Sequence, residues 1–337
     1  MRLSLLDLSP IPVGGDRHQA FLNTIDSAQK AEEYGYERIW VAEHHHAAAL
    51  AGRAPEVLIA LLAAKTKSIK VGSGSVLLNH YSPYKVAENF AALEEMFPGR
   101  IDMGIGRATT GPVSDYALQR NRATRQMSDD SNEQISELLH WMNNDFDKQH
   151  PFSKLPVYNN GTLPQMWLLG SSAWSASAAA ALGLRYSFAA FINPQQAYGI
   201  TQTYKREFEA SHRHTCIQKP ELMLSLSIYV GETEEDAARL AAPVQLMMLR
   251  MRQNGDTSSL LVSEDEAVEL MGGLRQPTPL TDPKDPPRVL AGTPKQIKTW
   301  LEEIAHTFGT HEIMVQCISA SHERRLKSLK LLAQAIK

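Results

Sequence analysis

Apolar residues along the chain follow two alternating spacings, one typical of strands and the other typical of helices. Short apolar runs, such as residues 3–8 and 38–42, predict buried strands. Between such runs, apolar residues recur every three or four positions, as in Ala28, Ala31 and Tyr34, which predicts one face of a helix. This alternation is typical of the α/β class.

The pattern predicts eight strands, each followed by a helix. Strands are expected at residues 3–8, 38–42, 69–78, 101–105, 166–169, 186–191, 222–230 and 311–318. Helices are expected at residues 20–34, 54–65, 83–96, 131–142, 172–182, 194–212, 233–251 and 323–336, with one more beginning after Thr293. Gly35 predicts a helix end, and Ser82 and Thr293, each followed by proline, predict helix starts.

Parallel strands joined by helices require right-handed crossovers, so eight such units predict a (β/α)8 TIM barrel. An open, doubly wound sheet is the competing architecture when periodicity alone is considered. No linker divides the chain, and residues 1–337 are expected to form one domain. The surplus over a minimal barrel falls in loops that follow strands, at 107–130 and in an insertion of about 252–291. These segments are either lids over the barrel mouth or plain insertions.

Composition narrows the function classes. Lys and Arg total 34 against 37 Asp and Glu, a net charge of −3, so the chain lacks the basic excess of a nucleic-acid or anionic-membrane binder. Two cysteines, Cys216 and Cys317, exclude a disulfide scaffold and suit the reducing cytoplasm. The longest apolar stretches are shorter than the roughly 20 residues that cross a bilayer, and Asp7 interrupts any N-terminal signal sequence.

Candidate chemistry lies where strands end, because a barrel of this class carries its site at the carboxyl ends of its strands. Gly170, Ser171 and Ser172 separate a strand from a helix, and a helix N-terminus offers free N–H donors to a phosphate. Arg107, at the end of the preceding strand, supplies a guanidinium for the same phosphate. Taken singly, Ser172 is also compatible with an ordinary N-cap, and Arg107 with a surface ion pair.

Three histidines, at positions 44 to 46, follow the second predicted strand. Consecutive residues on an extended chain point in alternate directions, so the run does not converge on a metal ion, and no metal is expected. An acid–base or hydrogen-bonding role fits better, because histidine changes charge near neutral pH. The alternative is that each histidine only caps a loop and has no chemical role.

Gly74 within a strand is a weak sign that a flat ligand approaches the backbone. No dinucleotide or P-loop fingerprint is present.

Several motifs together resemble the bacterial luciferase-like flavin-dependent monooxygenases, in the alkanal or alkane monooxygenase-like, non-luminous subgroup. The similarity covers nearly the whole chain. Its motifs are Leu6-Asp7-Leu8-Ser9-Pro10-Ile11-Pro12, Trp40-Val41-Ala42-Glu43-His44-His45, Val71-Gly72-Ser73-Gly74-Ser75-Val76-Leu77-Leu78, Pro98-Gly99-Arg100-Ile101-Asp102-Met103-Gly104-Ile105-Gly106-Arg107 and Trp167-Leu168-Leu169-Gly170-Ser171-Ser172.

The resemblance implies a (β/α)8 barrel that uses reduced FMN and O2 to oxygenate a small, apolar organic substrate through a C4a-(hydro)peroxyflavin. It implies that His44, together with His45, is catalytic. It also implies a non-proline cis bond between Gly74 and Ser75, beside Ser73 and against the flavin ring. For the phosphate it implies Arg107 and the group Gly170, Ser171, Ser172 and Ser175.

Two departures from the family pattern favour a non-luminous relative: glycine stands at 106 where luciferases carry a cysteine, and serine stands at 171 where they carry an acid. By the same resemblance, a separate NAD(P)H:flavin reductase supplies the reduced flavin, and the protein is a homodimer. An F420-dependent dehydrogenase and a non-catalytic flavin-binding protein are the alternatives.

Overall fold

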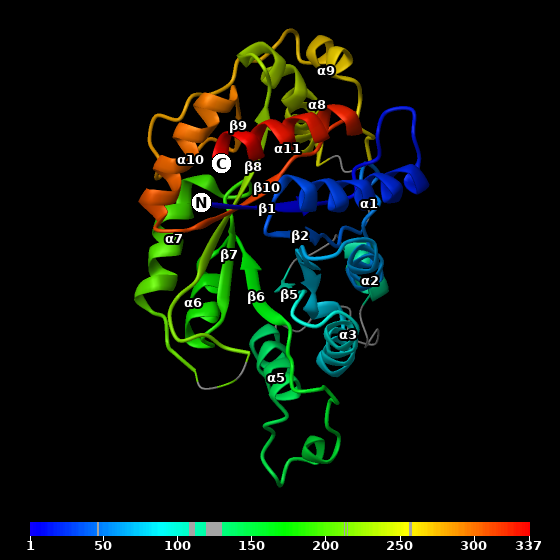
Figure 1. Cartoon of the computed structure of the whole chain (residues 1–337), viewed down its shortest axis with the longest axis vertical. Helices are drawn as coiled ribbons and strands as arrows, with labels where there is room; N and C mark the ends of the chain where they lie inside the picture. The colour runs from blue at the N-terminus through cyan, green and yellow to red at the C-terminus, as the bar shows by residue number, and fades with distance from the viewer. Residues whose placement is uncertain (46, 108–111, 119–129, 212, 214, 256–257) are drawn as a thin grey trace.

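Eight parallel strands close into a barrel in the computed structural model, which describes residues 1–45, 47–107, 112–118, 130–211, 213, 215–255 and 258–337 (Figure 1). The barrel strands, in spatial order, are β1 (Arg2–Asp7), β2 (Arg38–Val41), β3 (Lys70–Ser73), β5 (Ile101–Gly106), β6 (Gln165–Gly170), β7 (Arg185–Ala189), β8 (Leu222–Val230) and β10 (Glu312–Gln316). The last strand, β10, pairs in parallel with both β1 and β8. This closure confirms the (β/α)8 barrel and excludes the open sheet.

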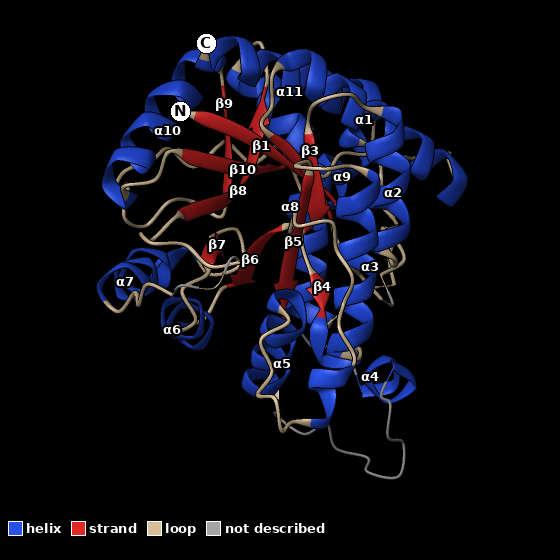
Figure 2. Ribbon diagram, turned by 60° about the horizontal axis from the view of Figure 1, so that its bottom comes forward, coloured by secondary structure: helices blue, strands red, loops and turns tan. Residues whose placement is uncertain are grey.

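Helices surround the barrel, and Figure 2 shows them outside the ring of strands. In chain order they are α1 (Arg17–Tyr34), α2 (Pro55–Lys65), α3 (Pro83–Met96), α4 (Pro112–Leu118), α5 (Ser131–Asn143), α6 (Ala173–Ala181), α7 (Pro194–Arg206), α8 (Glu234–Asn254), α9 (Glu264–Leu270), α10 (Pro294–Phe308) and α11 (His322–Ile336). Short 3-10 turns, η1 (Leu78–His80) and η2 (Pro151–Lys154), lie in two of the loops.

Local signals set several helix ends as the sequence predicts. Gly35 ends α1 at a φ of 86°, a left-handed conformation that glycine adopts without a steric penalty. Thr293 begins α10 with a capping box, in which its side chain and that of Gln296 satisfy each other's backbone N–H. Ser82 precedes α3 as predicted but makes no capping hydrogen bond, so Pro83 in the first turn is the effective start signal.

The strand predicted at residues 69–78 is wrong in detail. It is two strands, β3 and β4 (Val76–Leu77), and both pair with β5. The cis peptide between Gly74 and Ser75 takes these two residues out of the ladder.

Two other predicted boundaries also differ. A further strand, β9 (Val289–Gly292), lies at the end of the predicted insertion of about 252–291, where it extends the sheet beside the end of β8. Helix α7 ends at Arg206 instead of residue 212, which lies outside the described residues. The chain after α7 turns back there, and the Glu209 N–H bonds to the carbonyl of Ala180 near the end of α6.

Segment 252–291 is docked against its neighbours where it is described. Ala267 of α9 packs with Ala242 and Leu246 of α8 in a separate apolar cluster. Glu264, at the start of α9, pairs with Arg324 of α11 at 3.0 Å. Of the loop at 107–130, the structure describes Arg107, α4 and Asp130, and the rest lies outside the described residues. Among the described helices, none is long and apolar enough to cross a membrane.

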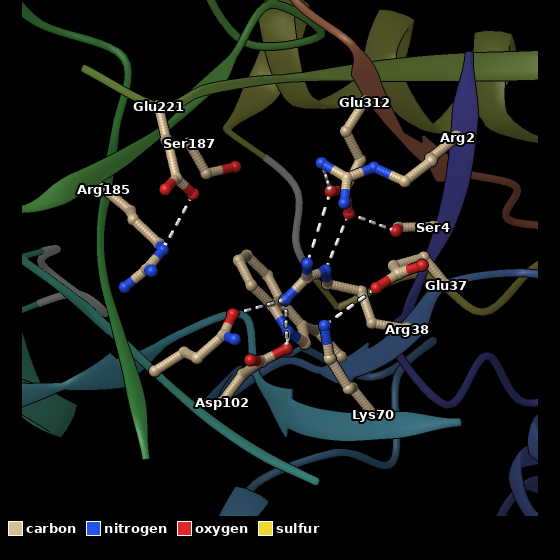
Figure 3. A network of polar contacts seen from close by, with 12 residues as sticks. Arg2, Ser4, Glu37, Arg38, Lys70, Asp102, Arg185, Ser187, Glu221 and Glu312 are labelled. Atoms are coloured by element: carbon tan, nitrogen blue, oxygen red, sulfur yellow. Dashed lines mark hydrogen bonds and ion pairs between the residues drawn. The ribbon is translucent and has the colours of Figure 1, made fainter. Parts of the chain in front are cut away.

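Buried charges fill the end of the barrel where strands begin (Figure 3). Arg38, the first residue of β2, donates to Asp102 of β5 at 2.7 Å and to Glu312 of β10 at 2.6 Å. Trp40 adds its indole N–H to the same Asp102 carboxylate at 2.8 Å. Burial by itself would lower the pKa of Arg38, but the two carboxylates raise it. Since this network is at the N-terminal face, we interpret it as structural.

Candidate active site at the carboxyl ends of the strands

The opposite end of the barrel brings together the strand ends that the sequence singles out. Ser73, the last residue of β3, lies against Gly104 of β5: its hydroxyl donates to the Gly104 carbonyl at 2.7 Å and accepts from the Gly104 N–H at 2.9 Å. A side chain at 104 would collide with the Ser73 backbone. Ser73 is fully buried, so its hydroxyl joins two strands at the floor of the mouth.

The peptide between Gly74 and Ser75 is cis, as the resemblance implies. The Gly74 N–H bonds to the carbonyl of Val41 at 2.8 Å, which joins this segment to the end of β2. A Cβ at position 74 would lie 2.6 Å from a methyl group of Leu6, so a larger residue there would require the Leu6 side chain to move. A Cβ at Gly106 would contact the Ser75 hydroxyl, which therefore occupies space that a cysteine at 106 would need.

His44 follows β2, and its backbone N–H bonds to the carbonyl of Gly52 at 3.0 Å. Its ring atom Nδ1 is buried and has no hydrogen-bond partner among the described residues. Burial, and then the nearby charge of His45, lower the pKa of His44 to about 4. At neutral pH its imidazole is therefore uncharged and has the capacity to accept a proton.

His45 does not act alone, because its Nε2 lies 2.6 Å from Oε1 of Glu43. The Tyr81 hydroxyl donates to the same oxygen at 2.6 Å, and the Leu77 N–H donates to Oε2 at 2.9 Å. Sequence reasoning missed Glu43 and Tyr81 as site residues. Glu43 had one signal, its place directly before the histidines, whereas the position of Tyr81 depends on how the chain folds after β4.

The phosphate candidates also converge. The Arg107 guanidinium lies over the ring of Trp174, in the first turn of α6, at 4.4 Å from the ring centroid. Ser172 is the N-cap of α6 and forms a capping box with Ser175. Asn193, after β7, donates to the carbonyl of Ser171 at 2.9 Å and fixes the turn from a third strand. A cation thus lies beside a helix N-terminus, as the sequence predicts.

The four residues of the predicted phosphate turn differ in exposure. Ser172 is exposed and Ser171 is partly exposed, whereas Ser175 is only 2% exposed. The Ser175 hydroxyl donates to the Ser172 carbonyl at 2.8 Å and lies 2.9 Å from the Tyr186 hydroxyl. A Cβ at Gly170 would collide with Ser175. Gly170 and Ser175 therefore shape the turn, and Ser171 and Ser172 border its open side.

Trp174 makes two kinds of contact. It packs against the main apolar cluster and also supports Arg107. A cation over an aromatic face is held by about 0.5–2 kcal/mol, enough to restrict a long side chain.

The residues fit a phosphorylated flavin on two observations of this structure. The first is the cation beside the α6 N-terminus, which suits a phosphate. The second is the buried, unpartnered Nδ1 of His44, a polar atom that a bound molecule would satisfy. Within the described ranges, no group of three or more His, Cys, Asp or Glu is arranged to hold a metal ion.

The family model for luciferase-like monooxygenases matches residues 1–312, and the chain belongs to this family. It is 35% identical to a luciferase-like monooxygenase of Escherichia coli, over 97% of this chain and 95% of the relative. It is 32% identical to N-acetyl-S-alkylcysteine monooxygenase of Bacillus subtilis, over 100% and 98%. The crystal structure of apo-MsnO8 superposes with a TM-score of 0.88 at 37% identity, covering 99% and 98% of the two chains. The protein is therefore an oxidoreductase of the monooxygenase class.

More distant structures share the fold. They include an FMN complex of the oxygenating constituent of 3,6-diketocamphane monooxygenase, with a TM-score of 0.73 at 19% identity. They also include an F420-dependent secondary alcohol dehydrogenase, with a TM-score of 0.67 at 16% identity. Flavin and F420 are thus both cofactors of proteins with this fold.

Proposed function

We propose that this protein is an FMN-dependent monooxygenase that uses reduced FMN and O2 to oxygenate a small, apolar organic molecule. The observation that carries the proposal is the Arg107 guanidinium stacked on Trp174 at the N-terminus of α6. Among the described residues, Arg107 is the arginine that lies beside this helix N-terminus, and one guanidinium suits the monophosphate of FMN. The longer acidic tail of F420 would call for additional basic residues.

In this proposal Arg107, Ser171 and Ser172 hold the phosphate, and Ser75 with the cis peptide lies against the flavin ring. When bound, reduced FMN would supply the electrons that activate O2. The protein's own residues would orient the flavin and the substrate, exclude water from the site and accept or donate protons. His44, uncharged at neutral pH, is the group that accepts a proton at the reacting end of the site, and the apolar residues Leu6 and Trp40 behind Gly74 keep water out.

We also propose that a separate NAD(P)H:flavin reductase delivers the reduced flavin, since the sequence has no dinucleotide fingerprint. Two free cysteines, Cys216 and Cys317, are compatible with the cytoplasm as the site of action. The N-acetyl-S-alkylcysteine relative makes thioethers a reasonable first class to screen, beside aldehydes and alkanes.

The test begins with anaerobic binding of reduced FMN, followed by mixing with O2 and recording of the flavin spectrum. Tight binding and a transient spectrum that differs from both reduced and oxidised FMN support the proposal. Arg107→Gln should weaken FMN binding by about 10- to 100-fold, the loss of a charge-assisted contact, and leave riboflavin binding unchanged. Oxidation at the rate of free flavin without binding would contradict the proposal and favour F420. Tight binding with no transient and no turnover would favour a flavin carrier.

We propose, in addition, a homodimer that covers α2. Between Glu56 in its first turn and Lys65 in its last, this helix carries apolar residues only, and Val57 and Leu61 on its outer side are 69% and 37% exposed. We expect Val57→Glu to convert a dimer into a monomer in size-exclusion chromatography with light scattering. Leu270→Glu, on the exposed side of α9, is the matched control and should leave the mass unchanged. A wild-type monomer, or a dimeric Val57→Glu variant, would contradict this interface.

A further inference from the structure

We propose that Glu43 is a positioning residue for His44, because its one buried carboxylate fixes the histidine loop against the chain that follows the cis peptide. This inference rests on the proposed function, in which His44 is the proton acceptor. The geometry that supports it lies entirely within the described residues around the end of β2.

Glu43 is 4% exposed and its side chain is fully covered. Its two oxygens receive three groups from three different segments: the His45 ring after β2, the Leu77 N–H in β4 and the Tyr81 hydroxyl after η1. A carboxylate is acceptor-only and accommodates all three, whereas a glutamine would offer one acceptor oxygen and bring an NH2 group against donors. The negative charge of the Glu43 carboxylate is therefore needed for all three contacts to form together.

The contacts of Glu43 join two segments of the candidate site, the loop after β2 and the chain that follows the cis peptide. His44 lies on the same loop as Glu43 and His45, and Leu77 belongs to the segment that begins at the cis peptide. The Gly74 N–H bond to the carbonyl of Val41 ties the same two segments a few residues earlier. Removing the carboxylate leaves the backbone bond but frees His45 and Tyr81, and the loop that carries His44 loses its fixed outer support.

Electrostatics point the same way. Burial, and to a lesser extent the charge of His45, lower the pKa of His44, and the Glu43 carboxylate places a negative charge 2.6 Å from the His45 ring. Burial and the hydrogen bond to Glu43 raise the pKa of Tyr81, so its hydroxyl stays protonated and donates. Burial raises the pKa of Glu56, at the start of α2, and the Glu43 charge raises it further. Tyr81 and Glu56 thus both sense the Glu43 charge.

The test uses the full-length protein without cofactor, labelled at histidine, and follows the His44 ring by NMR as pH falls from 8 to about 2.5, with circular dichroism to confirm the fold over the whole range. Glu43→Gln removes the negative charge that lies 2.6 Å from the His45 ring. We expect the His44 midpoint to fall by about half a pH unit or more below the wild-type value. Tyr81→Phe, which keeps the carboxylate and its His45 contact, should leave the midpoint within about 0.2 unit of the wild type. Glu43→Asp, which keeps the charge, should stay closer to the wild type than Glu43→Gln does.

A second measurement tests whether Glu43 acts through His44. The oxidation rate of bound reduced FMN by O2 is compared in Glu43→Gln, His44→Ala and the double variant. If Glu43 acts through His44, the double variant should match His44→Ala within about threefold, because residues that act as a unit are not additive.

An unmoved His44 midpoint, or losses that simply multiply, would overturn the role of Glu43. Failure of the wild type to bind FMN, or a His44→Ala variant that behaves as the wild type, would instead overturn the proposed function. The NMR titration would still decide the coupling between Glu43 and His44.

Discussion

His44 illustrates at the residue scale how surroundings set chemistry. Its ring is the same as that of the eleven other histidines in the chain, yet burial and the charge of His45 lower its pKa from 6.5 to about 4. The imidazole therefore remains uncharged across the physiological range, whereas a solvent-exposed histidine would be partly protonated. Only the folded structure shows this difference, because the three consecutive histidines look alike in sequence.

The shifted pKa makes the stability depend on pH with a definite sign. Between pH 6.5 and 4 the unfolded chain binds a proton at residue 44 that the folded protein excludes, so the free energy of unfolding falls as pH falls. We expect this one group to account for a loss of about 2 kcal/mol over that range. Urea unfolding at pH 7 and pH 4.5 measures it, and His44→Gln should lose correspondingly less stability on acidification. Equal losses in both proteins would contradict the buried, uncharged state of His44.

The same scale shows what sequence can and cannot indicate about a site. Arg107, Ser172 and the Gly74–Ser75 peptide were found because each stands at a strand end within a motif, and a barrel gathers its strand ends. Trp174 and Tyr81 carry no such signal. Trp174 reaches Arg107 only because α6 begins next to β5 in space, and Tyr81 reaches Glu43 only after the chain has passed the cis peptide. Contacts of this kind depend on tertiary geometry that spacing does not contain.

At the scale of elements, the barrel strands were predictable because each is a short apolar run between clear helix signals. The strand predictions that are wrong concern strands that are short or that pair with a neighbour on one side only. Strand β4 has two residues, and β9 lies outside the barrel beside β8 alone. Strands this short leave little periodic pattern, and their position depends on the neighbours with which they pair.

The connection between α1 and β3 depends on one carboxylate. Near the end of α1, Glu32 accepts the N–H groups of Lys67, Ser68 and Ile69, just before β3 begins. Burial by itself would raise the pKa of Glu32, but these hydrogen bonds lower it to about 2. Because the folded pKa lies below the ordinary value, the stabilisation is present above about pH 4.5 and is lost as pH falls towards 2.

Because Glu32 is partly exposed and solvent screens its charge, we expect Glu32→Gln to lower the free energy of unfolding by only about 1 kcal/mol at pH 7, and by less than half of that at pH 3. Chemical denaturation of both proteins at the two pH values tests this. The matched control is Glu33→Gln, which removes a contact with the exposed Lys30 and should change little at either pH. A Glu32→Gln effect that is the same at pH 3 and pH 7 would exclude the carboxylate charge as its cause.

At the scale of the whole molecule, the residues that stabilise the barrel and the residues of the candidate site lie at opposite ends of the barrel axis. Buried ions gather where strands begin, around Arg38 (Figure 3), whereas the candidate site lies where strands end, around His44 and Arg107. The ion pairs of Arg38 join strands that are far apart in sequence, from β2 to β5 and from β2 to β10. They therefore support the closed barrel as a unit. A defect there should therefore lower the stability of the whole protein while the site of the surviving folded molecules stays intact.

Arg38→Met tests this separation. Arg38 and Glu312 have side chains only 3% exposed and Asp102 is fully covered, so the substitution leaves the buried Asp102 carboxylate without its cation and leaves Glu312 with the exposed Arg2 as its ion-pair partner. We expect a loss of about 3–5 kcal/mol in the free energy of unfolding, the usual result of removing one partner of a buried ion pair.

Arg185→Met is the control. Its partner Glu221 is half exposed, and the loss in the free energy of unfolding should be about 1 kcal/mol or less. FMN affinity of the folded fraction should stay within about twofold in both variants, since the site lies at the opposite end of the strands. A loss of FMN affinity in Arg38→Met that exceeds its loss of folded protein would show that the two ends of the barrel are coupled.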